Sequence, residues 1–227
     1  MAAMRTVLAA VLGLAFWALP VSAQVVTKLP TSDKVVALTF DACEAPNKAA
    51  YFDHTILDYL EKEGLPFTMF PTGLFARRNA QELARVSRSP LVEVENHSFS
   101  HPMHMERLPP DRVASEIAAT DRLIQSITGR KPIFFRFPAG NYDAATLAEV
   151  EASGHRVVHW TFASGDPIRG LSPQHLEEWV LSKVRPGDIL IFHINGRAPA
   201  TGTALPVIVA RLKARGYRFV RLDEMLK

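Results

Sequence analysis

The chain has 227 residues, 48% of them hydrophobic, and its 26 Lys and Arg nearly balance its 23 Asp and Glu. This balance argues against a dedicated nucleic-acid binder, so we expect no nucleic acid as a partner. The single cysteine excludes an internal disulfide, and the length suits one domain with a full hydrophobic core.

Residues 1–23 have the pattern of a secretory signal peptide. Arg5 precedes an apolar run from Val7 to Leu19, and Val21-Ser22-Ala23 is a small-x-small cleavage site. The run is shorter than the roughly 20 residues that span a bilayer, which favours cleavage before Gln24 over a membrane anchor. We therefore expect a secreted or periplasmic protein with no stable membrane anchor after cleavage, and one domain over residues 24–227.

Short β-branched or aromatic runs then alternate with longer helical patterns. In chain order the predicted elements are a strand over Lys34–Asp41, a helix over Ala50–Glu63, a strand over Phe67–Pro71, a helix over Leu74–Ser87, a strand over Leu91–His97, a helix over Pro109–Thr128, a strand over Ile133–Pro138, a helix over Asp143–Ser153, a strand over Arg156–Phe162, a helix from Ser172 to Val184, a strand over Asp188–Ile194, a helix over Leu205–Arg215 and a strand over Tyr217–Leu222. This alternation predicts a parallel sheet with helical crossovers, in either an open or a barrel form. No Gly-x-Gly-x-x-Gly follows the first strand, so a nucleotide-binding fold lacks support.

Polar side chains collect where the predicted strands end. Asp41 ends the first strand, His97 the third and His193 the sixth. Arg136 lies near the end of the fourth strand, and Asp166 in the loop after the fifth. Each residue alone has an ordinary structural explanation, but the carboxyl ends of such strands form the active-site face of a barrel. Together the five side chains predict an active site there.

The two histidines of the NHSFSH segment, His97 and His101, are the sharpest pair. Their i, i+4 spacing on a helical turn places two imidazoles on one face, where both nitrogens can reach one metal ion. Asn96 is positioned to orient a ligand by hydrogen bonding. His104 is interpreted as peripheral because Pro102 interrupts the local helix. The remaining histidines are interpreted as structural: His54, His155, His159 and His175.

The segments TFD, NHSFSH, RFPAG, GDP and FH, in this order, resemble the motifs of the polysaccharide deacetylases of carbohydrate esterase family four, also called the NodB-homology domain. The resemblance covers the whole chain after the leader. It implies an α/β fold, an irregular (β/α)7-type barrel. It also implies a metal-dependent hydrolase, commonly with Zn²⁺, that removes N- or O-acetyl groups from a glycan such as peptidoglycan or a chitin-like oligomer.

The resemblance also implies catalytic roles for four of the residues at the strand ends. Asp41 would be the base that activates water, and Arg136 would pair with it and hold it ionised. His193 would be the acid that protonates the leaving amine, and Asp166 would orient His193. The family's metal ligands correspond to His97 and His101 in this sequence.

One metal ligand of the family is missing. The usual Thr-Phe-Asp-Asp motif carries a ligand at its second Asp, and this sequence has Ala42 there. Two histidines make an incomplete site, because catalytic zinc normally has three protein ligands. The sequence leaves open whether the metal is retained, and the candidates for a third ligand are Glu44, Cys43, Asp41 and His104.

The positions that contact substrate also depart from the family pattern. The backbone N–H of Ala139 would stabilise the oxyanion, and Ile191 would line a pocket for the acetyl methyl group. Ala139 replaces the family's usual Tyr, for which Tyr142 is a partial substitute. Pro167 replaces a Trp and Ile194 an Asp, which points away from a standard chitin-like polymer.

Three functions follow from these observations. The leading one is a secreted hydrolase of the carbon–nitrogen (non-peptide) bond of a glycan acetamide. The second is a catalytically silent glycan-binding protein on a deacetylase scaffold, suggested by the altered metal and groove positions. The third is a hydrolase of a non-glycan amide. Retention of Asp41, Arg136, Asp166 and His193 together favours an enzyme.

Overall fold

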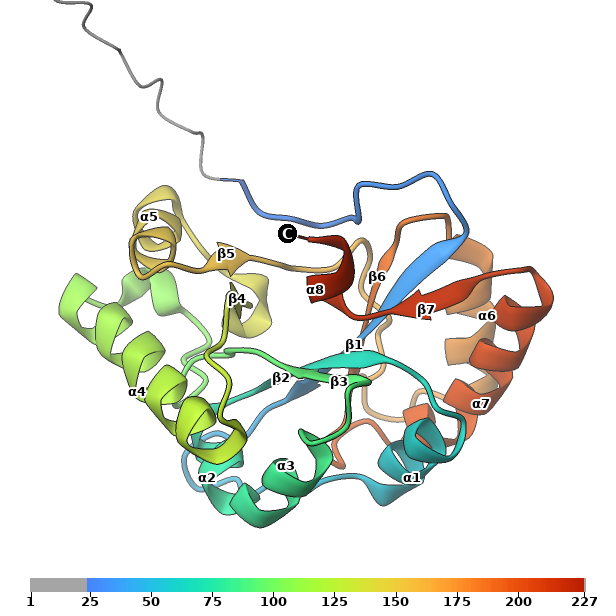
Figure 1. The fold of residues 1–227 in the computed structure, drawn as a ribbon, viewed down its shortest axis with the longest axis horizontal. Coiled ribbons are helices and arrows are strands. Elements are labelled where there is room, and N and C mark those ends of the chain that lie inside the picture. Colours follow the sequence, from blue (N-terminus) through green and yellow to red (C-terminus); the bar gives the residue numbers. More distant parts are fainter. Residues whose placement is uncertain (1–23, 227) are drawn as a thin grey trace, which may run out of the picture.

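A computed structural model describes residues 24–226 of the chain (Figure 1); the predicted signal peptide lies outside these residues. The strands are β1 (Val35–Ala42), β2 (Phe67–Pro71), β3 (Val92–Val94), β4 (Phe134–Phe135), β5 (Arg156–Val157), β6 (Ile189–His193) and β7 (Arg218–Val220). The α-helices are α1 (His54–Lys62), α2 (Gly73–Arg78), α3 (Ala80–Val86), α4 (Pro110–Thr128), α5 (Ala144–Ala152), α6 (Pro173–Lys183), α7 (Pro199–Ala214) and α8 (Leu222–Met225), and two short 3₁₀ helices are η1 (Met105–Arg107) and η2 (Pro138–Gly140).

Strand β1 is the centre of the main parallel sheet, whose order is β3-β2-β1-β6, with β7 also paired to β1. All eight of its residues are buried, as expected for an apolar run that is covered on both faces. The register pairs Asp41 with Phe70 of β2 and with His193 of β6. The sheet therefore brings two of the predicted catalytic residues to the same edge.

Strands β4 and β5 form a second, two-stranded parallel sheet. Isolated bridges from Asn96 to Phe135 and from Phe162 to Leu190 connect it to the main sheet. The predicted parallel α/β architecture is confirmed. A regular seven-stranded barrel is not, because the two predicted strands that would complete the ring shrink to two residues each.

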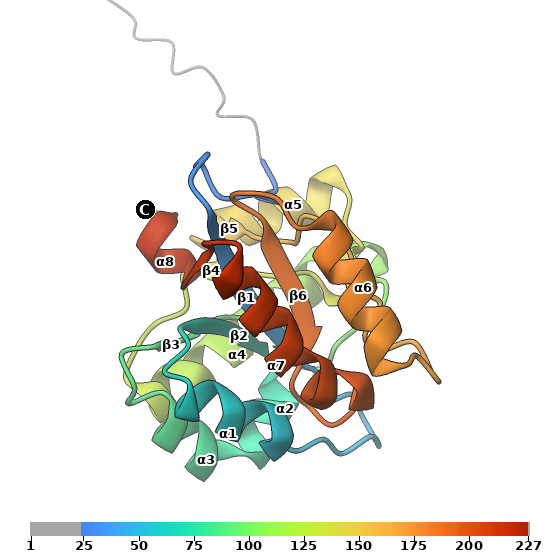
Figure 2. The ribbon, with the colours of Figure 1, turned by 90° about the vertical axis from the view of Figure 1, so that its right-hand side faces the viewer.

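Helices cover the outside of this sheet system. Figure 2 shows α1, α6 and α7 packed beside one another along the main sheet, where α7 contacts both of the others. Their apolar faces, including Leu57, Val180 and Leu205, join the helix-covered face of β1 in the largest hydrophobic core. No helix among the described residues is long and apolar enough to cross a membrane.

Several predicted boundaries were wrong for identifiable reasons. The helix expected over Leu74–Ser87 is two helices, α2 and α3, that meet at Asn79, whose side-chain amide donates to the carbonyls of Ala50 and Phe75. Helix α7 begins at Pro199, before the predicted start, and accommodates Pro206 inside it. The last predicted strand is shorter than expected, because β7 ends at Val220 and Leu222 begins the short helix α8.

Candidate active site

A cleft of about 360 Å³ opens at the carboxyl ends of β1 and β6. The residues that line it are Asp41, Cys43, His101, Met103, Ala139, Trp160, Ala163, Ser164, Gly165, Asp166, Pro167, Ile191, His193, Asn195 and Arg197. Arg136 and His97 are almost fully buried beneath its floor. The structure thus brings the predicted catalytic residues and the two histidines together at the carboxyl ends of the strands, where the sequence predicted a site.

On the β1 side of the cleft, Arg136 holds Asp41. Its Nη1 donates to Asp41 Oδ1 at 2.8 Å, and its other N–H groups donate to the carbonyls of Val158 and His159. Burial raises the pKa of Asp41, but the charges of His97 and Arg136 outweigh burial and lower it below its usual range. Asp41 is therefore ionised at neutral pH.

On the β6 side, Asp166 holds His193. Its carboxylate accepts the backbone N–H of His193 at 2.7 Å and the ring Nδ1–H at 2.9 Å, as well as the hydroxyls of Thr201 and Ser164. Burial lowers the pKa of His193, but the bonds with Asp166 and Cys43 outweigh burial and raise it well above its usual range. His193 therefore keeps both ring protons at neutral pH, and since Asp166 holds the Nδ1 proton, the Nε2 proton lies on the Cys43 side of the ring.

The two histidines come together in a loop, not on the predicted helical turn. Ser98 and His101 adopt the left-handed backbone region, with φ of 65° and 57°. These turns place the His97 and His101 rings edge to face, with centroids 5.1 Å apart. Asn96 holds the loop, because its side-chain oxygen accepts the N–H of Ser98. His97 Nδ1 donates to the carbonyl of Arg136 at 2.8 Å, so the ring is fixed.

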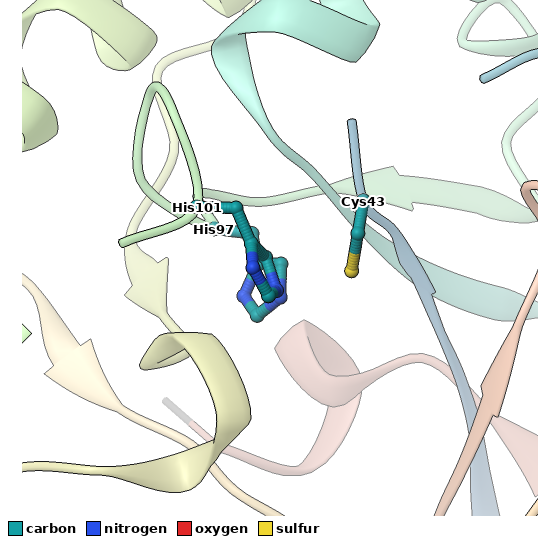
Figure 3. Close-up of side chains that lie close together, drawn as sticks. All are labelled: Cys43, His97 and His101. Atoms are coloured by element: carbon teal, nitrogen blue, oxygen red, sulfur yellow. The ribbon is translucent and has the colours of Figure 1, made fainter. Parts of the chain in front are cut away.

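Cys43 lies across from these rings, one residue beyond the end of β1. Figure 3 shows the two imidazoles beside one another and the thiol facing them from a different part of the chain. One ligand atom from each of Cys43, His97 and His101 lies within 4.8 Å of the others, as do ligand atoms of Asp41, Cys43 and His193. Burial raises the pKa of the thiol, but the charge of His97 and the nearby imidazoles of His101 and His193 lower it well below its usual range.

Two of the candidates for a third metal ligand lie elsewhere. Glu44 accepts two hydrogen bonds of 2.7 Å from Arg78 and a third from the N–H of Ala50, so its carboxylate is committed away from the histidines. His104 pairs with Glu106 at 2.9 Å, and its side chain is 51% exposed. Neither lines the cleft. The hypothesis that Glu44 repairs the metal site is therefore wrong for this structure.

Of the residues predicted to contact substrate, two line the cleft and one does not. Ile191 and Ala139 line the cleft, and Ala139 has a left-handed φ of 55°, which is uncommon for a residue with a Cβ and is frequent at functional sites. Tyr142 does not line it. Its ring stacks on Phe137 with centroids 5.4 Å apart.

Comparison with known proteins identifies the fold family. A family model described as polysaccharide deacetylase matches residues 28–158, more than half of the chain. The chain belongs to the polysaccharide deacetylase family. It is thereby placed among the hydrolases of that family.

Proteins similar to this chain include named deacetylases and esterases as well as a pseudoenzyme. The peptidoglycan-N-acetylglucosamine deacetylase of Bacillus cereus is 26% identical over 88% of this chain and 92% of its own length. A family 4 acetyl xylan esterase from Clostridium thermocellum, solved with a cobalt ion, is 30% identical, with a TM-score of 0.75 over 85% of this chain and 90% of its own. A CE4 family pseudoenzyme from Bacillus anthracis is 25% identical, with a TM-score of 0.79 over 91% of this chain and 70% of its own.

Trp160 and Asn195 line this deacetylase-family cleft and His159 lies beside Trp160, and the sequence analysis assigned none of them to the site. Trp160 lines it, and a Cβ at Gly140 would lie 2.9 Å from the indole, so only glycine fits there. His159 stacks on Trp160 and accepts from Arg136 through its carbonyl, and burial lowers its pKa to about 4, which keeps it neutral. Asn195 donates to the carbonyl of Cys43 at 2.7 Å. Asn195 directly follows the strand predicted over Asp188–Ile194, a signal like the one that identified Asp41, whereas Trp160 lies inside the strand predicted over Arg156–Phe162.

Proposed function

We propose that this chain is an exported, metal-dependent hydrolase that removes an acetyl group from an amino sugar of peptidoglycan or of a chitin-like oligomer. The observation that carries the proposal is a pair of neighbouring groups suited to proton transfer in one cleft, Asp41 bound to Arg136 and His193 bound to Asp166. The names of the relatives from Bacillus cereus and Bacillus subtilis, both peptidoglycan deacetylases, support this substrate class.

Hydrolysis of an acetamide needs a base for the attacking water and an acid for the leaving nitrogen, because an amine anion is a very poor leaving group. Asp41 is ionised by its pairing with Arg136 and is the base. His193 holds a proton through Asp166 and is the acid. Asp41 and His193 are register partners in β1 and β6, which supports their acting on one reacting bond.

The rest of the cleft suits an acetyl group on a ring. Ile191 offers an apolar surface for the acetyl methyl, and Trp160 offers a flat face on which a sugar ring can rest. The left-handed turn at Ala139 presents backbone toward the same space. Its N–H is the proposed donor to the oxyanion, a contact that typically contributes about 3–4 kcal/mol to the barrier.

His97 and His101 are the residues that would hold a divalent ion, and the donor set fits one. His97 Nε2 is buried and has no hydrogen-bond partner among the described residues, so its lone pair is available to bind a cation. Imidazole suits Zn²⁺. When bound, the ion supplies polarisation of the acetyl carbonyl and a lower pKa for water.

The test is acetate release from N-acetylglucosamine oligomers and from peptidoglycan, before and after chelation and on return of Zn²⁺. Asp41→Asn and His193→Ala should each lower release by at least about 100-fold. His104→Ala is the matched control, since it removes a neighbouring histidine outside the cleft, and it should leave release unchanged. Full activity in metal-free protein would refute the metal part of the proposal.

A second candidate is a catalytically silent glycan-binding protein. It is favoured by Ala42, which removes a family ligand, and by the similarity to a CE4 family pseudoenzyme. It predicts that the wild type binds the oligomers without releasing acetate, and that His193→Ala binds them equally well. Measurable release by the wild type that is lost in His193→Ala decides against it.

Export is the remaining part of the proposal, and it is supported by the leader pattern in residues 1–23. Expression of the full chain in a Gram-negative host followed by cell fractionation tests it. The expected result is periplasmic protein whose first residue is Gln24. Full-length protein that stays with the cytoplasm would refute export.

A further inference from the structure

The metal site implied by the two histidines needs a third donor from this chain. The family position, Ala42, cannot provide one, and its methyl group packs in the main hydrophobic core. Glu44 is committed to Arg78. Asp41 uses Oδ1 to bind Arg136, and its ligand atoms do not form a cluster with those of both His97 and His101. The carboxylates at this end of β1 are therefore poor candidates.

Cys43 occupies the position that remains. Successive side chains of a strand point to opposite faces, so residues 41 and 43 share a face while residue 42 points the other way. The structure agrees, because Asp41 and Cys43 line the cleft and Ala42 does not. The thiol is 6% exposed, and its ligand atom lies within 4.8 Å of those of His97 and His101.

The tautomer of His97 is an independent indication of a cation. Its Nδ1 lies 2.8 Å from the carbonyl of Arg136, which can only accept, so Nδ1 carries the hydrogen. In the neutral ring the lone pair is then on Nε2, which is buried and lacks a hydrogen-bond partner among residues 24–226. Asp41 Oδ2 lies 3.5 Å away without hydrogen-bond geometry. A ring fixed by a carbonyl at one nitrogen, with a bare second nitrogen, is the usual arrangement of a metal-bound histidine.

We infer that Cys43 replaces the missing carboxylate and completes a His₂Cys zinc site with His97 and His101. Thiolate and imidazole are the donors that zinc prefers, and three protein ligands leave one position for water or substrate. The inference deepens the proposed function, on which it rests for the role of the metal in this cleft. It assigns the site a softer donor than the carboxylate of the family.

The nearest rival is a thiol nucleophile, because Cys43 also lies close to His193, which Asp166 orients. In that reaction the sulfur would attack the acetyl carbon, His193 would protonate the departing amine, and water would then hydrolyse the thioester. That scheme gives no role to His101 or to the buried Nε2 of His97. The zinc site uses both rings and the bare nitrogen, so the observations favour it.

The test is metal binding by the purified chain, measured by elemental mass spectrometry and by the absorption of the Co²⁺-substituted protein. The wild type should bind one Zn²⁺, and its Co²⁺ form should show a sulfur-to-cobalt charge-transfer band in the near ultraviolet. Cys43→Ala should weaken Zn²⁺ binding by at least about 100-fold. Cys43→Asp should retain much of the metal and lose the band, and His104→Ala should keep both.

Each outcome decides the question. A wild-type Co²⁺ protein without the band, or Cys43→Ala with wild-type affinity for Zn²⁺, overturns the inference. Acetate release by metal-free wild type that accumulates an acetyl group on Cys43 overturns it in favour of the nucleophile. If Cys43→Ala does not fold by circular dichroism, the cobalt spectra of wild type and Cys43→Asp decide alone. A bound metal with the band but no acetate release supports the site and refutes the proposed function.

Discussion

Replacement of Asp166 by Asn tests how the cleft controls a proton. The carboxylate accepts the backbone N–H of His193 and the Thr201 hydroxyl at Oδ2, and the ring Nδ1–H at Oδ1. In Asp166→Asn the amide oxygen must remain at the first position, because a backbone N–H can only donate. The amide NH₂ then faces Nδ1 of His193, which forces that nitrogen to accept. The proton moves to Nε2, and the doubly protonated ring loses its partner.

The magnitude follows from the lost interaction. A hydrogen bond to a charged group contributes roughly 1.5–3 kcal/mol, and one pKa unit corresponds to about 1.4 kcal/mol. The pKa of His193, which Asp166 raises in the wild type, should therefore fall by roughly 1–2 units. The basic limb of kcat/KM for acetate release should move to lower pH by that amount, and the rate at pH 8 should fall by about 100-fold.

Stability should change in the same sense. A histidine whose pKa is raised by folding stabilises the protein below its unfolded pKa, and that stabilisation disappears as pH rises through the folded pKa. Thermal unfolding of wild type and Asp166→Asn should therefore differ more at pH 6 than at pH 9. Thr201→Val is the control, since it removes one donor to Asp166 but keeps the charge. An Asp166→Asn profile that coincides with the wild type, with His193 still doubly protonated by ¹⁵N NMR, would refute the reasoning.

Three further predictions use other groups. Arg136→Met should cost about 3–5 kcal/mol in chemical denaturation, because Asp41 is left buried without its counter-charge; a cost below about 1 kcal/mol would contradict a buried pair. Burial raises the pKa of Glu93 to about 7, so folding favours its neutral form, and the melting temperature should fall between pH 5 and pH 8 by the equivalent of roughly 3 kcal/mol. Glu93→Gln should flatten that fall, and an equally steep fall in the variant would show that another group causes it. Glu44→Ala should lower the free energy of unfolding by about 1–3 kcal/mol, because the ion pair between Glu44 and Arg78 is lost. The Zn²⁺ content of this variant should be unchanged in elemental analysis, and a loss of zinc would show that Glu44 is a metal ligand.

Much of the fold could be predicted from the sequence, because apolar runs and helical periodicity are local signals. The parallel alternation and the positions of β1, β2 and β6 follow directly from them. The lengths of β4 and β5 do not, because the same apolar residues can be buried by loops and isolated bridges as well as by a regular ladder. Closure of a barrel is a property of pairing over long distances, which no local pattern records.

The site residues also divide into those that local sequence reveals and those that depend on long-range packing. Asp41 and His193 could be located because a charge at the end of a buried strand is unusual and visible. The approach of His97 to His101 was predicted, but through a helical turn, whereas the loop reaches it by left-handed backbone at Ser98 and His101. The commitment of Glu44 to Arg78 could not be foreseen, because it depends on which helix packs beside the end of β1.

The pairing of β1 has a consequence for how the chain folds. Its partners β6 and β7 come from the other end of the sequence, since Ala37 pairs with Ile189 and Val36 with Phe219. Contacts between residues so far apart in sequence slow folding, because a long loop must close before they form. A nascent chain released before β6 would present the bare apolar edge of β1 to other chains, which is a route to aggregation. The edge of β1 is therefore protected from pairing with other chains only after the C-terminal strands β6 and β7 have been synthesised.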